Sequence, residues 1–434
     1  MVQRRRFSTG RSLIAVAAAV GFVASACGGE SGPPTVTWYV NPDAGGQEQL
    51  AAQCTEAAEG EYQITTALLP RDAPGQREQL ARRLAAQDPD IDLMSLDPAF
   101  IAEFADAGWL TEVPDDIAAD VTDGAVQAAV DVSTWNDALV AVPFWANTQL
   151  LWYRKSVAQE AGLDLENEPV TWQQLIEAAQ SQETLISLHG IREEAYAVWI
   201  NALVESAGGQ IVENPDAPAN EIQLTVDSDA GRQAAEIIQL IAREGVGGPG
   251  LSNQDEEGAM HQFNGEESAF MLNWPFVWAA INGAVEEGNL TEEFLDDIGW
   301  APYPAVAEGE DARPPYGGIS LAVSAFSDVP EAALDAAACI VTPENQAAYF
   351  AAEGNPASHP DAYENPDVQD AFPMADVILQ SLEQAGLRPH TPYYNEVSEG
   401  LQATWHPPAD VDPERTPADA TTLITEVLRG ERLL

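Results

Sequence analysis

Three short apolar segments in the first third of the chain decide the fold class, and they read TVTWYV (residues 35–40), YQITTALL (62–69) and DLMSL (92–96). Each is short and rich in apolar, aromatic or β-branched residues, which is typical of a strand. A segment of helical character follows each one, at residues 47–58, 75–86 and 98–107. Strands that alternate with helices predict an α/β fold with a mostly parallel sheet covered by helices.

The rest of the chain changes character twice. Residues 147–300 are rich in helix signals, clearest at 172–182, 195–206 and 229–244, with Gly-rich turns between them. Residues 316–323 then predict a further strand, and residues 330–351 predict one amphipathic helix that carries Cys339. The length of the chain suggests two or three domains.

The N-terminal residues have the three parts of an export signal. Basic residues at 4–6 and 11 precede an apolar stretch at 13–23, and small residues lead to Cys27. The apolar stretch is shorter than the roughly 20 residues that a membrane-spanning helix needs. The segment around Cys27 resembles the lipobox of bacterial lipoproteins, although Ala24 stands where Leu is usual. We therefore expect residues 1–27 to be a lipoprotein signal with Cys27 as the lipidated anchor, and residues 28–34 to be a flexible tether. A cleaved signal with an idle Cys27 is the alternative.

The charge of the chain excludes several classes of partner. Seventy acidic residues stand against 18 basic ones, which gives a net charge of −52. Nucleic acids and anionic membrane surfaces both reward clusters of Lys and Arg, so neither is expected to bind. The acids are spread along a chain that is 45% hydrophobic, which indicates a folded protein with an acidic surface. The ligand should be neutral or cationic.

Two cysteines follow Cys27, namely Cys54 and Cys339. In an exported chain a single long-range disulfide is favoured over two buried thiols, which remain the alternative. A disulfide would bring the strand at 316–323 and the helix after it back to the first domain.

Polar residues follow two of the predicted strands. Asp97 comes directly after residues 92–96, and Asn41 and Asp43 come after residues 35–40. Ligands of doubly wound sheets bind outside the carboxyl ends of the strands, where carboxylates and amides can bind sugar hydroxyls. Each of the three residues is equally suited to forming a turn or capping a helix.

Four further candidates lie later in the chain. Asn147 lies in an aromatic-rich segment and Trp274 precedes a proline, so both suit a sugar with a polar rim and an apolar face. A packed crossover strand is the alternative for the Asn147 segment, and a buried core position is the alternative for Trp274. Glu257 lies at a helix start, where it could contact a ligand or favour the helix. For Arg388 a structural salt bridge is the default interpretation, with a position in a cleft as the alternative.

Signatures of catalysis are weak. The sequence holds no Ser nucleophile elbow, phosphate loop or metal-binding His pair, and its five His are scattered. Seventy carboxylates offer many candidate acid/base pairs for a glycosidase without selecting one. We therefore expect a binding protein without cofactor or bound metal, with an exported glycan-cleaving enzyme as the alternative.

Several short sequence motifs resemble those of the solute-binding lipoproteins of carbohydrate ABC importers, most closely the actinobacterial trehalose-binding lipoproteins. The motifs that carry this resemblance are QLARRL (79–84), LD (96–97), AEFADAGW (102–109), NTQLLWYR (147–154), EEG (256–258), NWPFV (273–277), APYPAV (301–306), GG (317–318) and RP (388–389). The loop at residues 41–46 and the segment at 276–300 depart from the family pattern.

The resemblance implies a periplasmic-binding-protein-like fold of two lobes, with a neutral disaccharide such as trehalose held in the cleft between them. Residues 35–146 plus 302–351 would form the first α/β lobe, and residues 147–301 plus 352–434 the second, helix-rich lobe. A Cys54–Cys339 disulfide is implied as well. The protein would be an extracytoplasmic monomer, anchored to the cell membrane, that delivers its sugar to the permease of an importer. The implied ligand contacts are Asn41, Asp43, Asp97, Asn147, Glu257, Trp274, Gly318 and Arg388.

Overall fold

The computed structural model describes residues 32–265 and 267–434, so the expected signal segment and Cys27 lie outside the described residues. Residues 34–434 form one compact unit. It has a two-lobed mixed α/β fold, and each lobe is built on its own sheet. In the described residues, no helix is both long and apolar enough to cross a membrane.

A five-stranded sheet forms the centre of the first lobe. Its strand order is β2-β1-β3-β11-β6, and only β11 runs against its neighbours. The strands are β1 (Thr35–Val40), β2 (Gln63–Leu68), β3 (Leu93–Leu96), β6 (Val142–Thr148) and β11 (Tyr316–Val323). A separate small hairpin pairs β4 (Thr134–Trp135) with β5 (Ala138–Leu139).

Both faces of this sheet are covered, because alternate residues of its strands point to opposite sides. Trp38 and Leu93 pack with α1 and α13 in one core, whereas Tyr39 and Met94 pack with α2 and α3 in another. The helices near this sheet are α1 (Gly46–Ala57), α2 (Ala73–Ala85), α3 (Ile101–Asp106), α4 (Asp115–Thr122), α5 (Gln127–Val132) and α13 (Pro330–Ile340), with the short 3-10 helix η1 (Pro98–Phe100) before α3.

A four-stranded sheet with the order β10-β7-β9-β8 forms the centre of the second lobe. Its strands are β7 (Leu150–Arg154), β8 (Leu185–Ser187), β9 (Ser268–Asn273) and β10 (Ile298–Ala301). The remaining α-helices are α6 (Lys155–Glu160), α7 (Trp172–Ser181), α8 (Glu194–Ser206), α9 (Asp229–Glu244), α10 (Glu256–Phe263), α11 (Phe276–Glu286), α12 (Glu292–Asp296), α14 (Pro343–Glu353), α15 (Pro366–Ala371), α16 (Ala375–Glu383), α17 (Tyr394–Trp405) and α18 (Thr416–Leu428).

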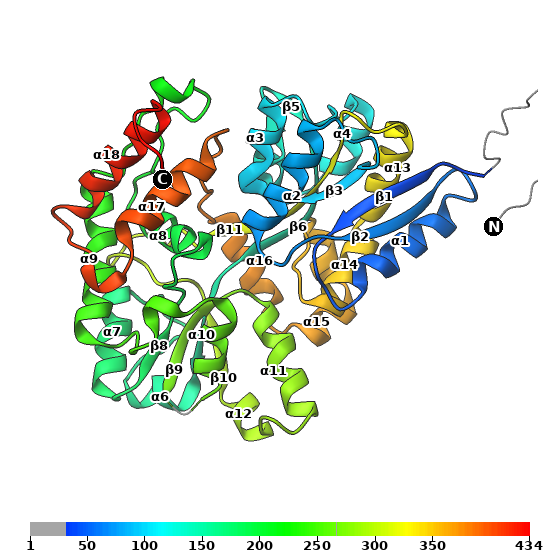
Figure 1. Cartoon of the computed structure of the whole chain (residues 1–434). Helices are drawn as coiled ribbons and strands as arrows, with labels where there is room; N and C mark the ends of the chain where they lie inside the picture. The colour runs from blue at the N-terminus through cyan, green and yellow to red at the C-terminus, as the bar shows by residue number, and fades with distance from the viewer. Residues whose placement is uncertain (1–31, 266) are drawn as a thin grey trace, which may run out of the picture. The chain divides into compact units, whose positions relative to one another are not determined.

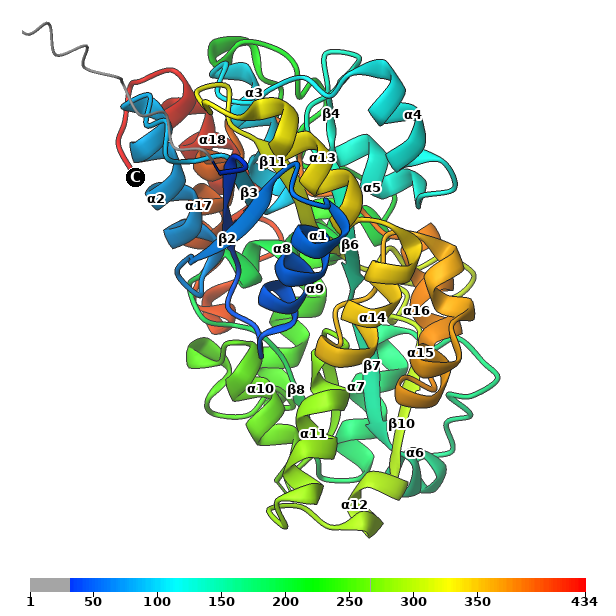
Figure 2. The ribbon, with the colours of Figure 1, turned by 90° about the vertical axis from the view of Figure 1, so that its right-hand side faces the viewer.

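The late helices fall into two groups. Helices α17 and α18 lie beside α8 and α9 (Figure 1), and their apolar residues join the core on one face of the second sheet. Helices α14, α15 and α16 are grouped together (Figure 2) and pack against the other face of β7. This second core also includes Ala146 and Tyr316 of the first sheet, so it joins the two lobes.

Helix α9 shows why some boundaries are predictable from sequence. The Ser228 side chain accepts a hydrogen bond from the Gly231 amide at the start, and Gly245 ends the helix in a left-handed conformation with φ of 72°. Caps of this kind each stabilise a helix by about 1 kcal/mol. The predicted helix at 229–244 is confirmed residue for residue.

The single helix predicted at 330–351 is wrong. The structure divides it into α13 and α14, with a break at Val341 and Thr342. Pro343 has no amide hydrogen to continue α13, and it disfavours helical conformation in the residue before it. The Thr342 side chain instead accepts from the Asn345 amide and begins a new helix.

The disulfide between Cys54 in α1 and Cys339 in α13 is present, with a Cα–Cα distance of 5.9 Å. It links two helices that cover the same face of the first sheet, although 285 residues separate them in sequence.

Candidate ligand-binding site

One edge of the first sheet gathers most of the predicted site residues. Asn41 follows β1, Asp97 follows β3, and Asn147 lies near the end of β6. Because β11 runs in the opposite direction, its first residues lie at the same edge, and Gly317 pairs with Asn147. Four strands thus bring polar side chains and a glycine pair to one place.

The second sheet begins where the first sheet's β6 ends, so one edge of the second sheet adjoins this edge of the first. Gln149 alone separates β6 from β7, and Leu150 at the start of β7 pairs with Asn273 at the end of β9. Trp274 follows Asn273 directly. The two edges therefore adjoin at the point where the chain crosses from one sheet to the other.

Arg388 joins groups from both sides of this junction. Its guanidinium donates through Nη2 to Oδ1 of Asp97 at 2.8 Å and through Nη1 to Oε1 of Glu194, at the start of α8, at 2.9 Å. Glu194 Oε1 also accepts from the Tyr394 hydroxyl. Burial alone would lower the pKa of Arg388, but Asp97 and Glu194 outweigh it and raise the pKa well above its ordinary value. Arg388, which is 8% exposed, is thus a permanent cation held between two carboxylates.

Asp97 caps a helix, which is one of the roles that its sequence position allows, and it also binds Arg388. Its Oδ1 accepts from the Ala99 amide at 2.9 Å, which caps η1, and from Arg388. No described residue donates to Oδ2. The second carboxylate oxygen is therefore free to accept from a ligand.

Trp274 is held by the first carboxylate of the EEG segment at 256–258, next to the predicted contact Glu257. Its Nε1 donates to Oε1 of Glu256, the first residue of α10, at 2.5 Å. The pKa of Glu256 is raised to about 7. Burial is the main cause, the indole hydrogen bond opposes it, and the neighbouring Glu194, Asp255 and Glu193 add to it.

The predicted Glu257 has different surroundings. It is exposed, and its Oε1 accepts from Nη1 of Arg71 at 2.6 Å. Arg71 lies between β2 and α2, so this ion pair also connects the two lobes. An exposed pair of this kind contributes little stability.

Asn41 and Asp43 differ in how far local contacts satisfy them. Asp43 accepts from the amides of Gly45 and Gln47 at 3.0 and 2.8 Å, so it orders the loop before α1. Asn41 donates to Gln76 at 2.9 Å, but its Oδ1 is buried without a partner in the described structure. Asp43 is thus satisfied within its own loop, whereas the Asn41 Oδ1 is unpaired but has almost no accessible surface in this structure.

Asn147 and Gly318 complete the predicted set. Asn147 Oδ1 accepts from the Thr148 amide at 3.0 Å, and no described residue accepts from its Nδ2. Gly318 has φ of 126°, and a Cβ there would lie 2.2 Å from the Trp145 carbonyl oxygen. The backbone itself requires glycine at position 318.

The site contains several side-chain oxygens that accept no hydrogen bond within the part of the protein that the structure describes. Among the described residues, one oxygen each of Asp97, Glu194 and Glu256 lacks a donor, and Asn41 Oδ1 is unpaired. The donors are the remaining N–H groups of Arg388 and the amide of Asn147. Such a set suits a neutral ligand with several hydroxyl groups, because each hydroxyl can donate to a carboxylate and accept from a donor.

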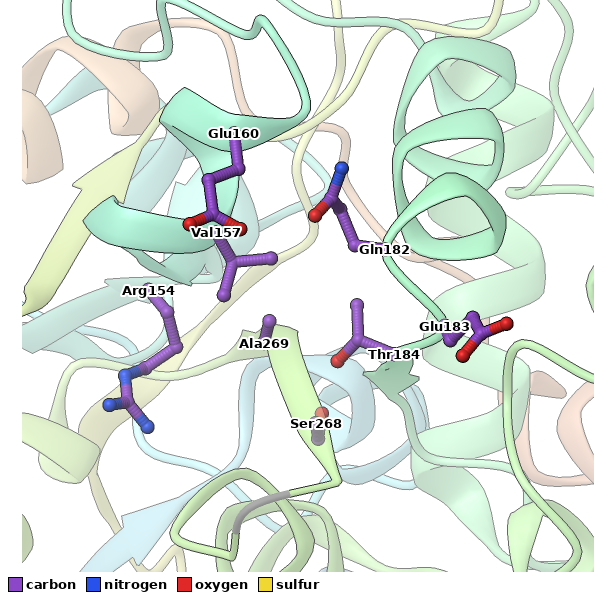
Figure 3. Close-up of a pocket in the computed structure, with 8 residues that line it drawn as sticks. All are labelled: Arg154, Val157, Glu160, Gln182, Glu183, Thr184, Ser268 and Ala269. Atoms are coloured by element: carbon purple, nitrogen blue, oxygen red, sulfur yellow. The ribbon is translucent and has the colours of Figure 1, made fainter.

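Two of the cavities in the described part of the chain bear on the location of the site. One of about 10 Å³, close to the size of one water, adjoins the site and is lined by Arg388, Tyr316 and His390 with three apolar neighbours. The other, of about 300 Å³, lies at the opposite edge of the second sheet and contains no predicted site residue (Figure 3). In it, Arg154 pairs with Asp297 and the Ser268 hydroxyl is bonded within the sheet. Those polar groups are already satisfied.

The fold and site define a two-lobed binding protein. Residues 42–347 match the family model of the bacterial extracellular solute-binding proteins, and the chain belongs to this family. Its members are binding proteins rather than enzymes, so the alternative of a glycan-cleaving enzyme is not supported, and the family is extracytoplasmic.

Individual relatives are more distant. A probable ABC transporter-binding protein of Deinococcus radiodurans is 25% identical over 352 residues, which cover 77% of this chain and 79% of that protein. The maltose-bound MalE3 of T. maritima superposes with a TM-score of 0.77 at 23% identity, covering 92% of this chain and all of that one. UgpB of Mycobacterium tuberculosis, in complex with glycerophosphocholine, gives 0.74 at 18%, covering 93% and 100%. These structural likenesses establish the fold.

Three residues of the site were missed by sequence reasoning: Glu194, Glu256 and Gly317. Glu194 carries no local signal, because an acid at a helix start is ordinary and its partner Arg388 lies 194 residues away. Glu256 and Gly317 stood inside the motifs EEG and GG, but only the fold decides which member of each pair contacts Trp274.

Proposed function

We propose that this protein is the extracytoplasmic sugar-binding component of an ABC importer, and that it binds trehalose or a similar neutral disaccharide between its two lobes. We place the lobe boundaries at residues 146/147, 301/302 and 351/352, and a lipid anchor at Cys27. The protein would act as a monomer and hand the sugar to membrane permease subunits.

The observation that carries the proposal is the charge and hydrogen-bonding balance around Arg388. One buried cation is shared by Asp97 and Glu194, each with a second oxygen that no described residue occupies. A phosphate or carboxylate ligand would meet these acids at close range and be repelled. A neutral polyol would donate hydroxyls to the free oxygens and accept from the guanidinium.

The aromatic component supports a sugar over a smaller polyol. Trp274 is half-buried, so part of its indole is accessible, and a pyranose ring has an apolar C–H face that can cover it. Trehalose in particular is favoured by motifs such as NTQLLWYR (147–154) and NWPFV (273–277), which resemble those of trehalose-binding lipoproteins.

Within this proposal the predicted residues take different roles. Asp97, Asn147 and Arg388 would bind hydroxyls, and Trp274 would stack on a ring. Asn41 would accept through its unpaired Oδ1 once its side chain rotates to expose this buried atom, while Asp43 and Gly318 would shape the loop and strand beside the ligand. Glu257 would contact sugar only after leaving Arg71.

The test is a panel of mono- and disaccharides incubated with the purified mature protein. We expect trehalose or a related disaccharide to raise the melting temperature, and chromatography of the same mixtures to show the sugar unchanged. Stabilisation by anionic sugars alone, or release of monosaccharide, would contradict the proposal.

A further inference from the structure

The Trp274 indole is held at two opposite edges. At one edge Nε1 donates to Glu256 Oε1 at 2.5 Å. At the other, Cη2 and Cζ3 lie so close to Gly317 that a Cβ at this position would be 2.9 Å from each of them. Real Cβ atoms essentially never approach other atoms this closely, so any side chain at position 317 requires the ring to move.

The base of Trp274 is fixed as well. Asn273 is fully buried, and its Oδ1 accepts from the Trp274 amide while its Nδ2 donates to the Glu256 carbonyl, both at 2.9 Å. The Asn273 carbonyl accepts in turn from Trp152 Nε1 at 3.0 Å. Because backbone and ring are both anchored, the indole cannot move away from a new Cβ without losing the Glu256 hydrogen bond.

We propose that Glu256 and Gly317 are positioning residues for the Trp274 indole, and that together they set the place and tilt of the surface on which the sugar stacks. This rests on the proposed function, because it takes Trp274 to contact the sugar. Glu256 belongs to α10 beside the second sheet and Gly317 to β11 of the first. The indole position therefore depends on both lobes.

The two glycines of this strand have separate reasons to be glycine. Gly318 is required by its positive φ and by the Trp145 carbonyl. Gly317 does not have a positive φ, so its backbone can accept alanine, and the obstacle is the indole itself. A Gly317→Ala substitution therefore tests the ring position rather than the fold of the strand.

The first measurement needs no sugar. In ¹H–¹⁵N spectra of the mature protein, the Trp274 indole N–H is identified as the cross-peak lost in Trp274→Phe. We expect Glu256→Ala to move this cross-peak upfield in the proton dimension, Glu256→Gln to move it less because an acceptor oxygen remains, and Gly317→Ala to move it as well. Gly283→Ala, with nothing within 4 Å of its added Cβ, and Glu292→Ala, an exposed first-turn residue of α12, are the matched controls and should leave it in place.

The second measurement is the affinity of the same variants for trehalose. We expect Gly317→Ala and Glu256→Ala each to weaken binding at least tenfold and Glu256→Gln to weaken it less, with both controls unchanged. The inference is overturned if the Trp274 cross-peak stays in place in both Gly317→Ala and Glu256→Ala. It is also overturned if both of these variants bind trehalose as tightly as the parent while Trp274→Ala abolishes binding. A parent protein that binds no sugar contradicts the proposed function instead, and the cross-peaks then still show whether the two residues hold the ring.

Discussion

Arg388 Nη2 donates to Asp97 Oδ1 at 2.8 Å, which connects the carboxyl end of β3 in the first sheet to the segment that precedes α17. The two side chains are 6% and 17% exposed, and Glu194 binds the other terminal nitrogen of the same guanidinium. Arg388 is therefore bound by one carboxylate from each lobe. This charged group of fixed geometry lies where we propose that the sugar binds.

Loss of the paired hydrogen bonds from the Arg388 guanidinium to Asp97 and Glu194 should weaken sugar binding. Arg388→Lys keeps the charge but cannot reach both carboxylates in the same geometry, and Asp97→Asn keeps the shape but loses the charge. We expect each to weaken trehalose binding at least tenfold, which corresponds to about 1.4 kcal/mol. Calorimetric titration measures the affinity, and circular dichroism checks the fold.

Arg232→Lys serves as the control, because Arg232 pairs with Asp229 at an exposed position. If Arg388→Lys lowers the melting temperature while affinity stays at the parent value, Arg388 is a structural salt bridge only.

Truncation of the aromatic platform should cost more affinity than stability. We expect Trp274→Ala to weaken trehalose binding by about 2 kcal/mol or more, the size typical of an aromatic anchor. Trp278→Ala is the comparison, since Trp278 packs against Trp300 and donates to the Ala371 carbonyl, and it should mainly lower the melting temperature. Trehalose should also alter the intrinsic fluorescence of the parent. Equal affinities of Trp274→Ala and the parent would remove the stacking contact.

Stability should depend on pH through Glu256. Its pKa is raised from 4.5 to about 7, mainly by burial, and the acids that face it are Glu193 and Glu194 at the start of α8 and Asp255 beside it. Between these two values the folded state holds a proton that the unfolded state has lost, so the contribution of this group to stability falls as pH rises through the window.

Glu256→Gln cannot ionise and escapes this loss. We therefore expect the melting temperature of Glu256→Gln, relative to the parent, to be more favourable at pH 8 than at pH 5 in scanning calorimetry. Glu292→Gln, at an exposed position, should show no such change. A difference from the parent that is the same at both pH values would mean that Glu256 titrates normally.

Removal of the disulfide should destabilise the first lobe. The loop closed by Cys54 and Cys339 is long, and the loop-entropy model assigns such a bond on the order of 4–5 kcal/mol, although measured values are often smaller. We expect Cys54→Ser with Cys339→Ser to lower the urea midpoint and leave trehalose affinity within twofold. Thiol labelling of the denatured, unreduced parent without Cys27 should find no reactive thiol, and finding two would show that the bond does not form.

Local patterns predicted much of the fold, and contacts distant in sequence account for what they missed. The strands at 35–40 and 316–323 were predicted residue for residue because apolar runs, Gly and turn residues mark their ends. The break at Val341 was missed because the apolar pattern continues across it, although Pro343 signalled it. The pairing of Arg388 with Glu194 has no local signal, since only the packing of α17 against α8 brings them together.

The candidate site shows the same limit at finer scale. Glu256 and Glu257 are neighbours of identical type, yet Glu256 is half-buried against Trp274 and Glu257 is exposed beside Arg71. Helical geometry turns adjacent residues by about 100°, so the choice depends on which face of α10 meets β9. The sequence therefore predicts that the segment at 256–258 is part of the site, but only the folded structure shows that Glu256 is the residue that contacts Trp274.

The most direct test of the account is a calorimetric titration of the purified mature protein with trehalose, repeated with Arg388→Lys. We predict saturable binding with one sugar per chain and no heat of continued turnover, and at least tenfold weaker binding by the variant. No saturable binding of trehalose or of any neutral disaccharide, by a parent protein that unfolds cooperatively, would contradict the central claim.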